Sequence, residues 1–262
     1  MDLTARQAEI SDLLRQEEFL TVESLADKFN VTTQTVRRDI NALCDYGQAR
    51  RKHGGVVPLS TDGNLAYGTR QVLNRVAKRS IAKKVASLIP NGSSISLGIG
   101  TTPEMVVRSL LKHQNLKIYT NNLIIAQTAS TNPSFEVYCS GGRIRSGDFD
   151  MVGSPVENFF NSYKTDFGIF GVAGVDMDGA LLDFSDEEVQ IRRVILDNCR
   201  ESLLVLDHEK FGRVAHVRGG QIQEVTKVFC DQSPPSDVSQ IIIDSEAEFV
   251  VCDKELMWVQ LK

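Results

Sequence analysis

A pair of short amphipathic helices joined by a tight turn is the sequence feature that most constrains how this chain can fold. The earlier helix follows Thr21, a good N-cap residue, and ends at Asn30, which tolerates a left-handed conformation. Its apolar residues are spaced i, i+3, i+4 and i+7: Val22, Leu25, Ala26 and Phe29. The later helix, which Thr32 can cap, buries Val36, Ile40 and Leu43. With a preceding helix that begins near Thr4, these segments predict three short helices in a helix-turn-helix arrangement.

The outward face of the later helix carries side chains that suit DNA. They have the same helical spacing and are Gln34, Arg37, Arg38 and Asn41. Arginine bonds guanine O6 and N7, and glutamine or asparagine bonds adenine N6 and N7. A solvated helix face is the alternative, but the two adjacent arginines lie in the first two turns, where a recognition helix meets base edges. We therefore predict that this helix, with Thr33 at its start, contacts DNA.

A basic segment follows the later helix and consists of Arg50, Arg51, Lys52 and His53. Gly54 and Gly55 come next and permit a hairpin turn between two short strands. A basic hairpin beyond a recognition helix is typical of the wing of a winged helix, which touches phosphates or enters the minor groove. A solvated run of charge is the alternative. Because the net charge of the whole chain is −5, a basic DNA-binding surface must be local.

These residues resemble the helix-turn-helix signature of the DeoR family of bacterial repressors. The match includes Arg6, Ile10 and Leu14 and the segment Thr-Thr-Gln-Thr-Val-Arg-Arg-Asp-Ile at 32–40, and the Arg-Lys-His-Gly-Gly wing belongs to the same pattern. The likeness extends over essentially the whole chain, and segments 166–169, 207–208 and 210–213 are similar to one branch of the family. The resemblance implies a repressor of a carbohydrate or phosphorylated-metabolite catabolic operon. Its effector would be glycerol 3-phosphate or a sugar phosphate.

The length of 262 residues fits either one large domain or a small domain followed by a medium one, and the pattern along the chain favours the second arrangement. We predict a winged helix-turn-helix at 1–58, a linker at 59–74 that is rich in residues that break regular structure, and an α/β effector and oligomerisation domain at 75–262. With 42% apolar and 24% charged residues, the chain is typical of soluble globular proteins. Neither an N-terminal apolar segment nor a membrane span is predicted, and the five scattered cysteines favour reduced thiols in a cytoplasmic protein.

Short β-rich runs alternate with helical runs after Pro90. Strands are predicted at 94–97, 116–119, 135–139, 167–172, 202–206, 227–230 and 249–252. Helices are predicted at 75–89, 103–112, 123–129, 156–161 and 186–198, and we expect the basic residues of the first of these to be solvated: Lys78, Arg79, Lys83 and Lys84. This alternation predicts βαβ units and a mainly parallel sheet, in which ligands bind at the carboxyl ends of the strands.

Three successive strand ends carry residues suited to an anionic or polar ligand. After the first come Gly98, Gly100, Thr101 and Thr102, followed by Pro103, which opens a helix whose N-terminus favours anions. After the second come Asn121 and Asn122, and after the third Gly141, Gly142 and Arg143. Each segment alone is equally well explained as an ordinary turn. Three of them at neighbouring strand ends are better explained as one pocket for a phosphorylated metabolite.

The family resemblance adds further expectations about the residues of this pocket. It implies that the larger domain is similar to the sugar-phosphate isomerase fold, with the Gly-Thr-Thr loop at the phosphate, and it places Lys210 near the ligand. Asp183 is a further candidate because it lies just before a helix that Ser185 can cap. The acids that open this helix are interpreted as stabilising its N-terminus, with Glu188 pairing with Arg192 one turn later.

Two functions of the larger domain remain open on the sequence alone, a sensor that controls DNA binding and an isomerase that retains turnover. Members of the isomerase fold carry a Lys-Gly-Gly-Gly segment after an acidic residue, whereas here Ala-Leu-Leu-Asp-Phe follows Gly179. We therefore expect no enzymatic activity, no catalytic residues, no metal and no cofactor. The expected partners are double-stranded operator DNA, a phosphorylated metabolite and further copies of the chain in a dimer or tetramer, because one winged helix offers a small interface.

Overall fold

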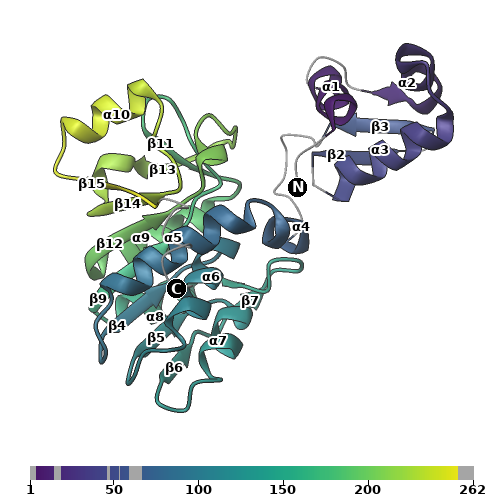
Figure 1. Ribbon diagram of the computed structural model, residues 1–262. Coiled ribbons are helices and arrows are strands. Elements are labelled where there is room, and N and C mark those ends of the chain that lie inside the picture. The colour runs from purple at the N-terminus through teal and green to yellow at the C-terminus, as the bar shows by residue number, and fades with distance from the viewer. Residues whose placement is uncertain (1–3, 15–18, 46–47, 53, 59–66, 253–262) are drawn as a thin grey trace, which may run out of the picture. The chain divides into compact units, whose positions relative to one another are not determined.

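The computed structural model describes residues 4–14, 19–45, 48–52, 54–58 and 67–252. The chain divides into two compact units, Met1–Leu73 and Asn74–Lys262. The elements of both units are labelled in Figure 1.

The first unit combines short helices with a small antiparallel sheet. Its helices are α1 (Ala5–Leu14), α2 (Val22–Phe29), α3 (Thr33–Asp45) and α4 (Tyr67–Val72), and its strands are β1 (Leu20–Thr21), β2 (Ala49–Lys52) and β3 (Gly55–Pro58). The strand order is β1-β3-β2. The predicted caps are confirmed, because the Thr21 hydroxyl accepts the N–H of Ser24 at 2.9 Å and Asn30 has a φ of 49°. The predicted stripes of α2 and α3 meet Ile10 and Leu14 of α1 in one core.

The helix α4 lies inside the segment predicted as an irregular linker. Residues 59–66 of that segment lie outside the described residues, and Tyr67–Val72 is helical. Gly68 weakened the helical signal in the sequence, but the Arg70 guanidinium lies 5.3 Å from the ring centroid of Tyr67, one turn away. A cation–π contact at this spacing supports a short helix that propensity alone does not predict.

The second unit is an α/β domain. Its helices are α5 (Arg75–Leu88), α6 (Thr101–Leu110), α7 (Leu123–Ala129), α8 (Ser154–Asn161), α9 (Asp186–Asp197) and α10 (Ser236–Ile243). The strands of its main sheet are β4 (Ser94–Leu97), β5 (Lys117–Thr120), β6 (Glu136–Cys139), β9 (Thr165–Phe170), β12 (Cys199–Val205), β14 (Lys227–Cys230) and β15 (Glu248–Val251). Each predicted strand and helix of this region is present, with ends that differ by up to three residues.

The seven strands of the main sheet, all within the described residues, run parallel in the order β15-β14-β12-β9-β4-β5-β6. From β4 the chain builds outward through β5 and β6, and it then returns to the other side of β4 to add β9 and the remaining strands. The strand order therefore reverses between β4 and β9. Such a reversal is the place where ligands of open α/β sheets usually bind.

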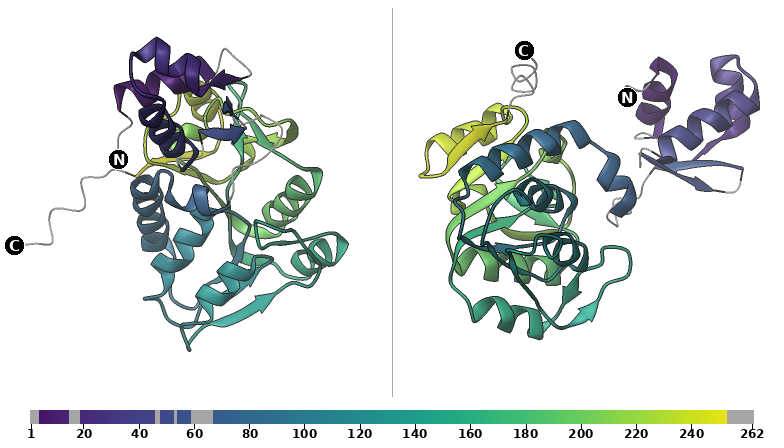
Figure 2. Two further views of the ribbon diagram at one scale, coloured as in Figure 1. Left: turned by 90° about the vertical axis from the view of Figure 1, so that its right-hand side faces the viewer. Right: turned by 60° about the horizontal axis from the view of Figure 1, so that its bottom comes forward.

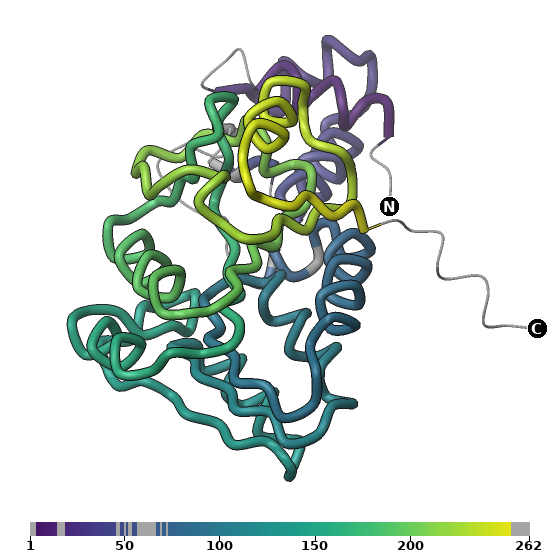
Figure 3. The backbone as a smooth tube through the Cα atoms, turned by 90° about the vertical axis from the view of Figure 1, so that its left-hand side faces the viewer, coloured from purple at the N-terminus to yellow at the C-terminus, as the bar shows by residue number. Residues whose placement is uncertain are grey.

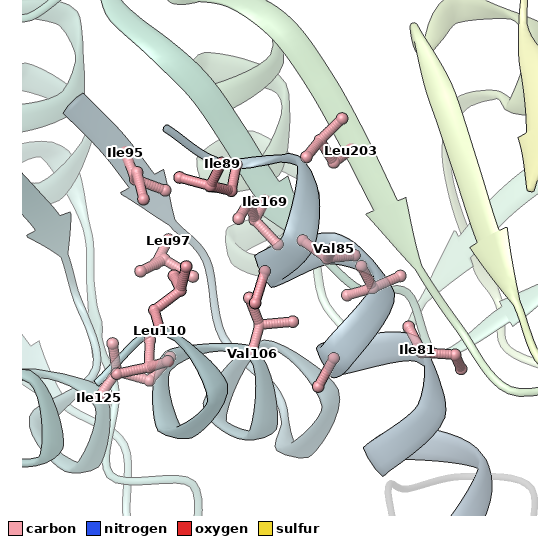
Figure 4. Close-up of a cluster of buried hydrophobic side chains, with 14 of the residues drawn as sticks. Ile81, Val85, Ile89, Ile95, Leu97, Val106, Leu110, Ile125, Ile169 and Leu203 are labelled. Carbon is pink, nitrogen blue, oxygen red and sulfur yellow. The ribbon is translucent and has the colours of Figure 1, made fainter. Parts of the chain in front are cut away.

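Helices cover both faces of this sheet, which gives the unit three layers (Figures 1 and 2). Residues of α5, α6 and α7 pack on one face, where Ile81, Val106 and Ile125 join Ile95 and Ile169 of the strands in a core that excludes solvent (Figure 4). Residues of α8, α9 and α10 pack in the core of the other face. Lys78, expected to be solvated, is only 3% exposed, because it lies on the same stripe of α5 as Ile81 and Val85.

Two smaller β structures lie beside the main sheet. A three-stranded antiparallel sheet has the order β10-β11-β13, formed by β10 (Gly174–Val175), β11 (Ala180–Asp183) and β13 (Val217–Gln221). The hairpin of β7 (Arg143–Ile144) and β8 (Met151–Val152) follows β6, and the path of the chain through both can be traced in Figure 3. Within the described ranges, no helix combines the length and the apolar character needed to cross a membrane.

Candidate functional site

One face of α3 presents the predicted recognition residues to solvent. Thr33, Gln34, Arg37, Arg38 and Asn41 are all exposed, whereas the opposite stripe of the helix lies in the core. Thr32 caps the helix, because its hydroxyl accepts the N–H of Thr35 at 3.2 Å. The first turns of α3 thus offer hydrogen-bonding side chains together on a fixed helix, as base recognition in the major groove requires.

The predicted wing is a hairpin whose strands β2 and β3 pair from Ala49 with Pro58 to Lys52 with Gly55. Arg51 is exposed, and its guanidinium Nη1 donates to Asn41 Oδ1 at 3.1 Å. This bond joins the wing to the recognition face of α3. The side chains of Arg50 and Lys52 and the whole of His53 lie outside the described residues.

The orientation of α3 is fixed by a polar contact with α1. Asp39 points from α3 into the unit and is 5% exposed. Its carboxylate accepts from Arg6 Nε at 2.6 Å and from Gln7 Nε2 at 3.1 Å. The Asp39 carboxylate raises the pKa of Arg6, which keeps the guanidinium charged. Arg6 and Asp39 both belong to the motif noted in the sequence. Their contact gives a structural role to the acid that follows the two outward arginines.

In the second unit a small cavity, with a volume of about 20 Å³, lies at the carboxyl ends of β4 and β9. Gly98 and Ile99 line it from the loop after β4, and Gly171 lines it from the loop after β9. Its other walls are Phe170, Asp183, Glu188, Ile191, Arg192 and Ile195. The cavity thus occupies the reversal of strand order and contains two of the predicted effector residues, Gly98 and Asp183.

Asp183 is the more deeply buried acid of this cavity, and it is 6% exposed. Its Oδ2 accepts from Arg192 Nε at 3.0 Å, and its Oδ1 accepts the N–H of Ala173 at 3.1 Å. Arg192 also donates from Nη1 to the carbonyl oxygen of Gly219 at 2.9 Å. Burial raises the pKa of Asp183 to about 6, although the neighbouring guanidinium acts in the opposite direction.

Glu188 does not pair with Arg192, so the pair predicted along α9 is wrong. Instead its Oε1 accepts from Arg145 Nη1 at 2.9 Å, and its Oε2 accepts the N–H of Phe184 at 3.0 Å. Arg145 comes from the turn of the β7–β8 hairpin and also binds Asp150 at 2.8 Å. Arg192 is already engaged by Asp183, a partner nine residues away in sequence that helix periodicity does not reveal. Ser185 does cap α9, as predicted.

The predicted strand-end residues lie along the same edge but in different surroundings. Thr101 and Thr102 are buried at the start of α6. They directly follow Gly100, which has a φ of 123°. Asn121 is fully buried and donates from Nδ2 to the carbonyl oxygen of Met151 at 2.8 Å. The Oδ1 of Asn122 accepts the N–H groups of Ile124 and Ile125, so this side chain caps α7.

The remaining predicted residues are more accessible. Gly141, Gly142 and Arg143 are exposed, and Arg143 donates to both carboxylate oxygens of Glu187 at 2.9 Å. Lys210 is half-buried in the short 3₁₀ turn His208–Lys210 that follows β12. Neither residue lines the cavity at β4 and β9. The charged residues of the cavity that the sequence analysis does not assign to the effector site are Glu188 and Arg192, which it interprets as stabilising the helix.

Comparisons with known proteins identify the family. A model of the DeoR-like helix-turn-helix domain matches residues 6–62, and a model of the DeoR C terminal sensor domain matches residues 73–232. The chain belongs to the DeoR family. It is therefore a transcriptional regulator with a DNA-binding helix-turn-helix and a sensor domain.

Curated relatives of this DeoR-family chain are repressors by name. The glycerol-3-phosphate regulon repressor of Escherichia coli (strain K12) is 40% identical over 96% of this chain and 100% of its own length. The HTH-type transcriptional repressor CsqR of the same organism is 36% identical over 94% of both chains. These names describe regulators and not enzymes, which supports the sensor interpretation over the isomerase. They also agree with the family resemblance in the sequence.

Among solved structures, ribose 5-phosphate isomerase A from Methanocaldococcus jannaschii is similar to this DeoR-family chain with a TM-score of 0.39 and 16% identity. The similarity covers 53% of this chain and 55% of the isomerase chain.

Proposed function

We propose that this chain represses a catabolic operon and that a small phosphorylated metabolite, bound in the second unit, sets its affinity for operator DNA. Regulation of this kind requires the effector to bind two states of the protein with different affinities. The observation that carries the DNA-binding half is the exposed recognition face of α3, where Gln34, Arg37 and Arg38 stand free of the core.

In this proposal α3 enters the major groove, and Arg37 and Arg38 contact base edges or phosphates with Gln34 and Asn41. The wing, with Arg50, Arg51, Lys52 and His53, contacts the backbone or the minor groove. The hydrogen bond from Arg51 to Asn41 supports a concerted approach, because it holds the wing against the recognition face. Most of the affinity would come from phosphate contacts, and the sequence preference from the α3 side chains.

The effector is proposed to bind in the cavity at β4 and β9. Its phosphate would lie at the loop of Gly98, Gly100, Thr101 and Thr102, where the N-terminus of α6 favours an anion and has no side-chain cap. Asn121, Gly141, Arg143 and Lys210 would complete the edge of the site, with Asn122 supporting the loop through its cap of α7. Glycerol 3-phosphate is the first candidate, because a relative with 40% identity is named for it.

We also propose that the chain acts as a dimer or tetramer. A single winged helix contacts a short half-site, and two copies on repeated half-sites would supply the additional affinity and specificity that an operator needs.

A binding titration with labelled DNA from the promoter region of this chain's own gene tests the proposal. Mobility-shift or fluorescence anisotropy measurements are made with and without glycerol 3-phosphate and a panel of sugar phosphates. We expect specific binding that one of these compounds alters by at least tenfold. If the chain binds the DNA specifically but no compound alters its affinity, the effector part of the proposal is wrong. If the folded protein shows no specific DNA binding, the proposed repressor function is wrong.

A further inference from the structure

The first helix of the second unit carries an exposed basic stripe, the α5 stripe, formed by Arg75, Arg79 and Lys83. Its members are four residues apart, so they share one face of α5 at intervals of about 6 Å along the helix axis. The opposite face, with Ile81 and Val85, is buried in the core. The fourteen residues of α5 include five bases and no acid. This helix therefore presents an uninterrupted positive surface.

The charges of the α5 stripe are not neutralised by the fold. Seven of the arginines in the second unit form salt bridges with carboxylates. By contrast, in the part of the chain that the structure describes, Arg75, Arg79 and Lys83 form no salt bridge. The stripe thus leaves three positive charges open to an external anionic partner.

Helix stability does not explain these charges. Arg75 is the first residue of α5, where the helix dipole disfavours a positive charge. Like charges four residues apart, as at Arg75 and Arg79 or at Arg79 and Lys83, also destabilise a helix. The N-cap residue Asn74 does not compensate, because its side chain makes no capping hydrogen bond and donates instead to Asp207 Oδ1 at 3.0 Å. A partner outside the helix explains the stripe better than local stability does.

Double-stranded DNA is the anionic partner that the rest of the chain favours. The chain has 29 basic and 34 acidic residues, so a helix with bases alone departs from its average charge. Only residues 59–74 separate the wing strand β3 from α5. Because an extended chain spans at most about 3.6 Å per residue, Arg75 stays within roughly 60 Å of the wing. This tether raises the local concentration of bound DNA around α5 above that of other polyanions.

We propose that the α5 stripe contacts the phosphate backbone of the operator duplex, beside the segment that α3 and the wing bind. The second unit then contributes directly to DNA affinity, in addition to sensing an effector. Phosphate contacts carry no sequence information, so the stripe adds affinity and not specificity. The inference rests on the DNA-binding part of the proposed function and adds a second DNA-contacting surface to it.

The triple variant Arg75→Gln with Arg79→Gln and Lys83→Gln tests the inference in the full chain. Fluorescence anisotropy measures binding to promoter DNA of the chain's own gene, and to scrambled DNA of the same length, at several salt concentrations. Each phosphate contact contributes about 0.9 to the slope of log affinity against log salt concentration. We expect this slope to be smaller by about 2, and the affinities for both duplexes to fall by a similar factor of about ten or more.

The matched control is Lys112→Gln with Arg200→Gln and Arg218→Gln. It also removes one lysine and two arginines, from exposed positions of the second unit outside α5. This variant should keep the slope and the affinities of the wild type, because it changes the net charge without touching the stripe. Circular dichroism melting verifies that both triple variants fold.

The inference is wrong if the stripe variant keeps the wild-type slope, or if the control variant lowers the slope as much. It is also wrong if the stripe variant loses affinity for the promoter DNA alone, since a phosphate contact acts on every sequence. In each of these cases the proposed repressor function stands. If the folded wild type binds neither duplex, the DNA-binding part of the proposed function fails, and the inference fails with it.

Discussion

Arg6 and Asp39 connect the first and third helices through a 2.6 Å contact between Arg6 Nε and Asp39 Oδ2. The arginine is about one-third exposed, whereas the aspartate side chain is 7% exposed, so the pair joins a solvated cation to a buried anion. Gln7 donates to the other carboxylate oxygen of Asp39. One side of α3 is thus anchored by charge, and its opposite face remains available for DNA.

Replacing Asp39 with alanine should destabilise the first unit by about 2 kcal/mol, because hydrogen bonds to a charged group are lost. Differential scanning calorimetry of the full chain measures the shift of the corresponding transition. Asp45→Ala is the control, since Asp45 is exposed at the carboxyl end of α3, where an acid is unfavourable. Equal melting temperatures for Asp39→Ala and the wild type would show that the contact does not hold the helix.

Arg37→Ala should lower the affinity for the operator by at least tenfold and leave the melting temperature unchanged, because the side chain is exposed and directed away from the core. Fluorescence anisotropy with operator and scrambled DNA measures the loss of specificity. Lys28→Ala removes the same charge from an exposed position of α2 and should have a much smaller effect. Undiminished operator binding by Arg37→Ala would refute the assignment of α3 as the recognition helix.

Gly55→Ala should disrupt the wing and weaken DNA binding. A Cβ at this position would overlap the carbonyl oxygen of Leu20 in the paired strand β1 and approach the Phe19 ring at 2.8 Å. Gly54→Ala is the comparison, because it meets no atom within 4 Å and suffers only from its φ of 80°. We expect the loss of stability to be greater for Gly55→Ala than for Gly54→Ala, which should cost about 1 kcal/mol. The reverse order in chemical denaturation would contradict this account.

The double substitution Thr101→Ala with Thr102→Ala should weaken effector binding by about tenfold or more, because hydrogen bonds to an anion are among the stronger ones. DNA binding without effector should stay normal, since both residues belong to the second unit. Calorimetric titration with glycerol 3-phosphate measures the change, with Thr131→Ala, in the exposed turn that follows α7, as control. A normal response would remove this loop from the site.

Asp183 should make the stability of the second unit depend on pH. Its pKa is about 6 in the folded chain against 3.8 ordinarily, so the folded state binds this proton more tightly. The stabilisation is complete below about pH 4 and is lost as the pH rises through about 6, which amounts to roughly 3 kcal/mol.

Asp183→Asn lacks this titration. The difference in unfolding free energy between wild type and variant should therefore fall as the pH rises from 4 to 7, as chemical denaturation at several pH values can measure. A constant difference would mean that the ion pair with Arg192 cancels the effect of burial, and a difference that grows with pH would mean that the ion pair outweighs it.

Local patterns in the sequence predict the strands of the main sheet and the helices α5 to α9 of the second unit, but not α10 or the small sheet of β10, β11 and β13. The strands 94–97 and 227–230 and the helix 123–129 were predicted with their observed ends, because apolar runs bounded by turn residues define them. The caps at Thr21 and Ser185 were predicted for the same local reason.

Contacts between distant segments could not be predicted in this way. Arg145 contacts Glu188, which lies 43 residues later in the chain. Arg192 contacts Asp183, which lies before the first residue of α9 and not on the helix itself. An acid near a helix N-terminus looks the same in sequence whether it stabilises the helix or faces a cavity. The contact of Glu188 with Arg145 depends on the fold, which brings the β7–β8 hairpin beside α9, and local sequence patterns do not reveal it.

The interior position of β4, between β9 and β5, also has a consequence for the order in which the chain acquires its structure. Ile95 pairs with Ile118 nearby in sequence, but its other neighbour is Phe167, more than seventy residues later. During synthesis the helix-turn-helix and its wing are complete long before the sheet can close around β4. Because distant parallel pairing is slow, we expect nascent chains to pass through a stage with a folded first unit and an unfinished sensor.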